Sequence, residues 1–195
     1  MRDDDQLGGW PAVVNRIVRG DRPSQPRVVL GPTPSILLEL GLNSGALTMS
    51  AEKLARCRRE HSEVALDVWH RLPQLIANPL AVFPSYKRDG SVVLLLLEID
   101  RDGNPVVAAV IPDSGPLNVV LSVYGKQDGL AWAQKEIARA IADQLPVFEG
   151  KDFAASLPQP PAVETASSSR GLIPVDGTTK SKREILHLPK ESSKS

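Results

Sequence analysis

The stretch AVFPSYKRDGSVVLLLLEIDRDGNPVVAAVIPDSGPLNVVLSVY, residues 81–124, decides the fold class. The connectors KRDG, DRDGN and PDSGP are rich in turn residues and short enough to close hairpins. Between them lie apolar runs that we expect to form strands, at residues 81–85, 92–99, 106–111 and 117–124. The second and third runs are apolar at nearly every position, so both faces of those strands should be covered. The pattern predicts an antiparallel meander sheet of about four strands.

Helical patterns precede the meander. Ser50 is a good N-cap, with Glu52 in the first turn, for a helix that runs to about His61. A second helix follows over residues 64–77, where Pro73 either kinks it or separates two short helices. Shorter elements are expected upstream, namely helices over residues 10–18 and 34–40 and a strand over residues 27–30.

One helix and a short strand follow the meander. Residues 130–142 carry an apolar stripe that should pack on the sheet, formed by Leu130, Ala133, Ile137 and Ile141. Residues 145–148 are a candidate strand. Because helices come first and a run of strands follows, the fold class is α+β, with N-terminal helices and a meander packed against helices. The strict βαβ alternation of a nucleotide-binding fold is absent from the sequence.

Composition limits the domain organisation and the class of protein. The chain has 195 residues, of which 42% are hydrophobic, enough for one domain with a real core. We expect a polar extension over residues 1–26, the α+β domain over 27–150, and an extended Pro- and Ser-rich tail over 151–195. Within that tail, residues 183–188 form an apolar island that is expected to dock as a strand.

Charge and cysteine content exclude several kinds of protein. With 23 basic and 23 acidic residues the net charge is zero, so any basic surface for a nucleic acid must be local. Cys57 is the single cysteine, which excludes an intramolecular disulfide. The first ten residues are not a signal peptide, and the most apolar run is too short to span a bilayer. We therefore expect a cytoplasmic protein without a membrane partner.

A basic cluster on the helix after Ser50 ends at a histidine. It consists of Lys53, Arg56, Arg58 and Arg59, and His61 follows it. A histidine side chain gains and loses its proton near neutral pH, which suits general acid–base catalysis. The alternative is structural, because basic residues and a terminal histidine also stabilise the carboxyl end of a helix.

The last strand of the meander offers polar side chains on one face. Strand alternation places Asn118, Val120, Ser122 and Tyr124 together, and Lys126 lies just beyond them. A polar face on a core strand needs partners or lines a cleft, where these groups can donate to a phosphate. The alternative is an edge strand or a solvent-facing strand with ordinary polar residues.

The order of several short phrases resembles a known family. These phrases are LGPTPSILLELGL, LTMS, RLPQLIANPLAVF, GSVVLLLLEI, DGNPVVAAV and LNVVLSVYG, followed by a helix that contains Trp132. Over about residues 28–148 they resemble the phage-associated nuclease-like domains of the barnase–EndoU–colicin–RelE-like superfamily. Such domains occur in large polyvalent phage proteins and at the C-termini of MuF-type phage head proteins. The resemblance implies metal-independent cleavage of RNA.

One position departs from the family's pattern. The family carries a lysine five residues before the histidine that ends the helix, and Arg56 stands there in this chain. An arginine keeps the charge but cannot act as a base, so the change favours phosphate binding or charge stabilisation.

The sequence and the resemblance together predict an RNase-like toxin or effector domain of phage or mobile-element origin, which cleaves RNA by attack of the 2′-hydroxyl. No metal or cofactor is expected, and the expected partners are RNA, with tRNA as one candidate, and a protein inhibitor or immunity partner. The expected catalytic residues are His61, Arg56, Ser122 and Tyr124. The expected substrate-binding residues are Lys53, Arg58, Arg59, Asn118 and Lys126.

Two alternatives remain open at this point. A non-catalytic interaction module of a phage or mobile element is favoured by the neutral net charge and by arginine at position 56. A nucleic-acid binder without chemistry would show salt-dependent RNA retention and no cleavage.

Overall fold

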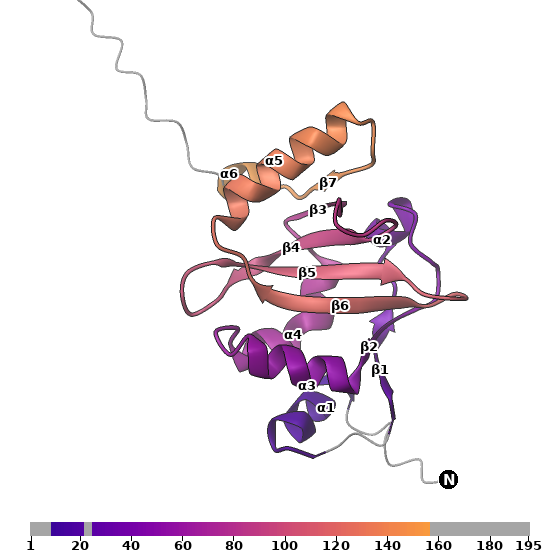
Figure 1. Cartoon of the computed structure of the whole chain (residues 1–195), viewed down its shortest axis with the longest axis vertical. Helices are drawn as coiled ribbons and strands as arrows, with labels where there is room; N and C mark the ends of the chain where they lie inside the picture. The colour runs from indigo at the N-terminus through magenta and orange to yellow at the C-terminus, as the bar shows by residue number, and fades with distance from the viewer. Residues whose placement is uncertain (1–8, 22–24, 157–195) are drawn as a thin grey trace, which may run out of the picture. The chain divides into compact units, whose positions relative to one another are not determined.

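The computed structural model describes residues 9–21 and 25–156, and Figure 1 shows the arrangement of their helices and strands. The elements in chain order are α1 (Gly9–Val18), β1 (Arg27–Pro32), α2 (Ser35–Glu39), β2 (Ala46–Ser50), α3 (Ala51–Glu60), α4 (Leu66–Ala77), β3 (Ala81–Pro84), β4 (Val92–Ile99), β5 (Pro105–Pro112), β6 (Asn118–Gly125), α5 (Gly129–Ala142), β7 (Phe148–Glu149) and α6 (Phe153–Ser156).

The α+β class and the meander are confirmed, and the sheet is larger than predicted. Strands β3 to β6 pair as antiparallel neighbours in sequence order. The described residues form a sheet of seven strands in the order β1-β2-β6-β5-β4-β3-β7, against the expected four or so. The additional strands are β1 and β2 at one edge and β7 at the other. Because β2 pairs with β6 in parallel, the sheet is mixed.

Helices cover both faces of the sheet, as the apolar character of β4 and β5 predicted. The helices α1, α3 and α4 pack on one face, where Leu94 and Leu96 of β4 join the larger hydrophobic cluster. The helices α5 and α6 pack on the other face, where Val93 and Leu95 join a second cluster (Figure 1). Alternate side chains of one strand thus enter two cores, which explains why the run is apolar throughout.

The predicted N-terminal helix is confirmed as α1, and it belongs to the larger core. Trp10, Val14 and Ile17 are buried, and the Trp10 indole Nε1 donates to the carbonyl of Trp69 at 2.6 Å. The predicted domain boundaries at residues 26/27 and 150/151 stay predictions. The tail from residue 157 onward, including the expected docking segment 183–188, lies outside the described residues.

Three local expectations need correction or completion. Ile141 is 56% exposed, because Ala140 takes the last buried position of the α5 stripe. The short strand expected over residues 145–148 is confined to Phe148–Glu149. Pro73 lies inside a single twelve-residue helix, α4, so the two-helix alternative is excluded.

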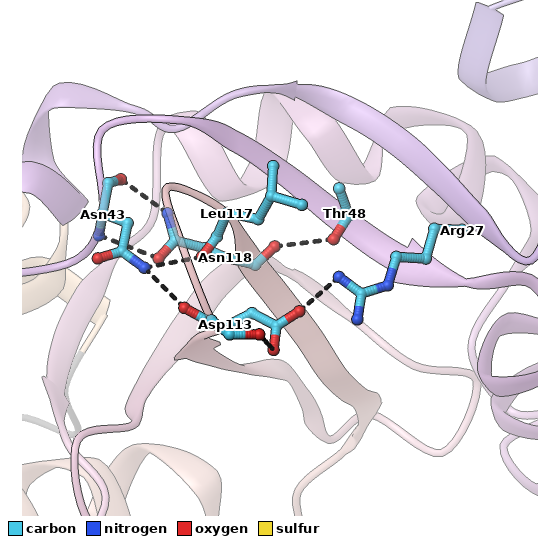
Figure 2. Close-up of polar contacts among 7 residues, drawn as sticks. Arg27, Asn43, Thr48, Asp113, Leu117 and Asn118 are labelled. Atoms are coloured by element: carbon cyan, nitrogen blue, oxygen red, sulfur yellow. Dashed lines mark hydrogen bonds and ion pairs between the residues drawn. The ribbon is translucent and has the colours of Figure 1, made fainter.

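The side-chain amide of Asn118, at the start of β6, is buried and binds the segment that precedes β2 (Figure 2). The Asn118 Oδ1 accepts from the Asn43 backbone N–H at 3.0 Å. Its Nδ2 donates to the Thr33 hydroxyl at 2.7 Å and to the Asn43 carbonyl at 2.8 Å. The Asn118 carbonyl also accepts from the Thr48 hydroxyl at 3.0 Å. The parallel pairing of β2 with β6 covers only Leu47 with Asn118 and Thr48 with Val119. These side-chain hydrogen bonds therefore add substantially to the few backbone bonds at this β2–β6 junction.

The same junction is reinforced by the loop between β5 and β6. The Asn43 side chain donates to the carbonyls of Asp113 and Leu117, at 3.2 and 2.9 Å. The Gly45 N–H donates to the Pro116 carbonyl at 2.8 Å, and a Cβ at Gly45 would lie only 2.3 Å from that oxygen. The backbones therefore approach more closely than any residue with a side chain would allow.

We predict that Asn118→Ala lowers the free energy of unfolding by about 2–4 kcal/mol, because several buried donors and acceptors lose their partners together. Denaturant unfolding monitored by circular dichroism measures this change. Asn15→Ala, which removes an exposed amide, is the matched control and should change stability by less than about 0.5 kcal/mol. An Asn118→Ala variant as stable as the control would contradict the structural role.

A second prediction concerns the ion pair between Arg27 on β1 and Asp113, drawn in Figure 2. The backbone N–H of Ser114 and the Arg27 guanidinium lower the pKa of the Asp113 carboxyl. A lowered folded-state pKa contributes stability above the unfolded pKa, and this contribution is lost as the pH falls through the folded pKa. Asp113→Asn should therefore lower Tm at pH 7, and the difference from wild type should shrink as the pH falls through the lowered pKa of the Asp113 carboxyl. Thermal unfolding at a series of pH values measures it, and a constant difference would contradict it.

Candidate functional site

The position of His61 follows from β2. Ser50 ends β2 and caps α3, because its hydroxyl accepts from the Lys53 N–H at 3.0 Å, as predicted. The helix ends at the predicted residue, His61, whose N–H donates to the Cys57 carbonyl at 2.8 Å. Strand and helix therefore join without a loop, and the placement of β2 determines the placement of His61.

His61 lies against the end of β6. Its ring centroid is 5.5 Å from that of Tyr124, with the two rings tilted by 35°. Its Nδ1 lies 3.1 Å from the Glu63 Oε1, and the side chain is 31% exposed. With Nδ1 protonated the ring donates to this carboxylate, which orients the imidazole and leaves Nε2 for a proton transfer.

The predicted common face of Asn118, Val120, Ser122 and Tyr124 is wrong, because β6 contains a bulge. Ala109 pairs with Ser122 and Val110 pairs with Val120, so Leu121 is an extra residue that reverses the alternation. Val120 belongs to the larger core beneath α3 and α4. Tyr124 packs against the second core on the α5 side, with Ser122 on the same side of β6.

Ser122 and Tyr124 open into a cavity of about 370 Å³. Its walls come from the turn between β3 and β4, from β5 and β6, and from α5. Lys126 also lines the cavity, with its Nζ 5.3 Å from the centroid of the Trp132 ring. Burial raises the pKa of the Tyr124 phenol, so the hydroxyl keeps its proton at neutral pH and can donate. The structure thus brings Ser122, Tyr124 and Lys126 together at one cavity, and His61, which does not line that cavity, contacts Tyr124.

Arg56 and Arg59 lie elsewhere. Both line a larger open cavity of about 1420 Å³ among α1, β1 and α3, which shares no lining residue with the first. The Arg56 Nε donates to the Glu60 carboxylate at 2.8 Å, and this bond raises the pKa of Arg56. Lys53 lines neither cavity. The expected group of Arg56, His61, Ser122 and Tyr124 therefore does not converge on one cleft.

Two further candidates have structural partners. Arg58 donates to the Val64 carbonyl at 3.0 Å and lies over the Trp69 ring, 5.8 Å from its centroid. Burial, followed by repulsion from Arg101, lowers its pKa. Asn118 is fully buried, with its amide engaged at the junction of β2 and β6.

Two residues, one that contacts His61 and one that lines the cavity, were not singled out from the sequence. Glu63 has a recognisable signal, a carboxylate two residues after a histidine that ends a helix. Tyr86 lies in the turn between β3 and β4, where sequence patterns indicate only a hairpin connection. Its role depends on contacts with α5, more than fifty residues later.

Among residues 9–21 and 25–156, no group of three or more His, Cys, Asp or Glu side chains could hold a metal ion. Nor is any helix there long and apolar enough to cross a membrane.

Arg58 and Arg59 are neighbours with different surroundings, which gives a stability test. We predict that Arg58→Ala lowers the free energy of unfolding by about 1–3 kcal/mol, because it removes a partly buried hydrogen bond and a cation–π contact. Arg59→Ala, at an exposed position, should change it by less than about 0.5 kcal/mol. Urea unfolding of both variants measures the difference, and equal stabilities would show that Arg58 has no structural role.

Comparison with known proteins bears on the origin of the domain. No curated protein and no solved structure shows significant similarity to the chain. A family model of the phage MuF C-terminal domain matches residues 53–151, which is about half of the chain. This range begins within α3 and extends to the residue after Gly150, so it includes His61 and all of the meander. The chain belongs to the phage MuF C-terminal domain family.

Proposed function

We propose that this domain cleaves RNA without a metal ion, by attack of a ribose 2′-hydroxyl on the adjacent phosphorus. The observation that carries the proposal is the ring contact between His61, oriented by Glu63, and Tyr124, which itself lines a cavity together with Ser122 and Lys126. This arrangement joins a proton-transfer group to hydrogen-bond donors and a cation. Those are the parts that such a cleavage requires.

Each residue has a defined role in the proposed reaction. His61 Nε2 accepts the proton of the 2′-hydroxyl as the new oxygen–phosphorus bond forms. Tyr124 and Ser122 donate hydrogen bonds to the phosphoryl oxygens, and Lys126 stabilises their negative charge. The bond between phosphorus and the 5′-oxygen breaks, and the leaving oxygen takes a proton from solvent water. The products are a 2′,3′-cyclic phosphate and a 5′-hydroxyl, and His61 then returns its proton to solvent. Lys126 takes the charge-stabilising role first considered for Arg56, because Arg56 lines the other cavity.

Membership of a phage protein family supports an effector acting on cellular RNA in the cytoplasm, with tRNA among the candidate substrates. A toxic RNase would also require a protein inhibitor in the cell that makes it. We propose that such an inhibitor covers the cavity beside Tyr124.

A second candidate function, a non-catalytic interaction module, is favoured by the separate cavity among α1, β1 and α3. Arg56 and Arg59 line it, and on a chain with no net charge these exposed arginines form a local basic surface. An acidic partner protein suits that surface.

Incubation of the purified protein with total RNA and with tRNA in EDTA tests the catalytic proposal. We expect discrete cuts that end in a 2′,3′-cyclic phosphate. His61→Ala should reduce the cleavage rate by about 10²- to 10⁴-fold, because the acid–base group is lost. Tyr124→Phe keeps the ring contact and removes the donor, so it should also slow cleavage.

The matched control is His70→Ala. His70 lies on α4, where its Nε2 is 2.9 Å from the Oδ1 of Asn15 on α1. Cleavage by the control should equal that of wild type, and all variants should retain their Tm. Absence of cleavage by wild type, with a partner retained by both wild type and His61→Ala, would select the interaction module.

A further inference from the structure

We propose that Tyr86 is the stacking platform for one unpaired RNA base, which occupies the cavity between the β3–β4 turn and α5. The choice of RNA as ligand rests on the proposed function, whereas the cavity and the held tyrosine ring are independent of it. The proposal assigns a binding role to the α5 side of the sheet. It also predicts single-stranded rather than duplex RNA as the substrate.

The cavity has the size and walls of a ligand site. Its volume of about 370 Å³ lies in the lower part of the range of small-molecule pockets. Its floor includes Ala109 and Ser122, two small residues paired across β5 and β6. Its aromatic walls come from different elements: Tyr86 from the turn and Trp132 from α5. Small floor residues leave space between these rings.

The Tyr86 ring is held from one side. The Arg139 guanidinium lies over it, 3.6 Å from the centroid, and the phenol hydroxyl donates to the Asp143 carboxylate at 2.8 Å. Arg139 does not line the cavity, whereas Tyr86 does and is 37% exposed. The ring therefore offers its other face to a ligand, and its orientation is determined before the ligand binds. A preorganised aromatic face is what unpaired bases stack on.

Trp132 is also held by its neighbours and lines the same cavity. Its ring packs edge-on against Phe83, with centroids 5.3 Å apart and planes at 72°. The Lys126 ammonium lies over the same tryptophan, and Lys87 and Arg88 line the turn side of the cavity. These cations are placed to bind the phosphates that flank a stacked base. Tyr124 lines this cavity and also contacts His61, so a base in the cavity would lie beside the residue that contacts the proposed acid–base group.

Binding of uncleavable RNA tests this inference separately from catalysis. We would use fluorescein-labelled 2′-O-methyl RNA hexamers, one for each base, because a blocked 2′-oxygen cannot attack. Fluorescence anisotropy would give Kd for the full chain, with a duplex of the same length as competitor. A hexamer with 2-aminopurine would report stacking through loss of its fluorescence.

Tyr86→Leu should weaken hexamer binding by about 5- to 100-fold, because a leucine offers no ring face to the base. Tyr86→Phe keeps the ring and should bind within about twofold of wild type. Lys126→Gln should weaken binding and reduce its salt dependence, whereas Lys135→Gln, on the exposed side of α5, should not. Quenching of 2-aminopurine should be lost in Tyr86→Leu alone among these variants.

Several results would overturn the inference. These are equal Kd values for wild type and Tyr86→Leu, preferential binding of the duplex, or no hexamer binding by wild type. Tm measurements on every variant separate loss of the ring from loss of folding. Tyr86→Phe, which keeps the ring, should restore the binding that Tyr86→Leu loses. Hexamer binding that depends on Tyr86 in a protein that cleaves no RNA would overturn the proposed catalysis and leave this inference standing.

Discussion

The buried side-chain amide of Asn118, at the start of β6, makes the interactions on which the rest of this domain depends. It accepts one hydrogen bond and donates two to residues of the segment before β2, and it lies at a parallel pairing only two residues long. Because β2 continues into α3 at Ser50, the short pairing of β2 with β6 determines where α3 lies relative to β6. Cys57 on α3 contacts the Val123 backbone, and His61 at the helix end reaches Tyr124. A residue expected to touch substrate instead positions the element that carries the proposed acid–base group.

The bulge at Leu121 divides β6 into two functional halves. Before it, Asn118 and Val120 face the layer of α3 and α4 and contribute hydrogen bonds and packing. After it, Ser122 and Tyr124 face α5 and open into the cavity. One strand therefore supplies both the support and the polar wall of the candidate site. Bulges often occur where a side chain must be redirected near a functional site, and this one redirects a serine and a tyrosine.

Local patterns predicted much of the fold and part of the site. The hairpin connectors, the Ser50 cap and the end of α3 at His61 were all recognisable, because each depends on residues close together in the chain. Strand β2 was not predicted, since five residues of mixed character give a weak signal and its partner on β6 lies about seventy residues later. The common face on β6 was misjudged for a related reason. A bulge is a property of the pairing between two strands, and strict alternation along one strand cannot reveal it.

The amino-acid sequence by itself determined the α+β class and the order of the meander strands and the helices around them, and it singled out His61 and Tyr124 as candidate residues. Only the tertiary structure decided which candidates meet. It placed Ser122, Tyr124 and Lys126 around one cavity and set His61 against Tyr124, whereas Arg56 lines another cavity and Asn118 is buried in a structural junction. It also revealed Tyr86, whose ring is held by Arg139 and Asp143 from a distant helix. The physical reason is that short-range periodicity and capping act within a few residues, whereas register, bulges and cavity walls arise from contacts between segments far apart in the chain.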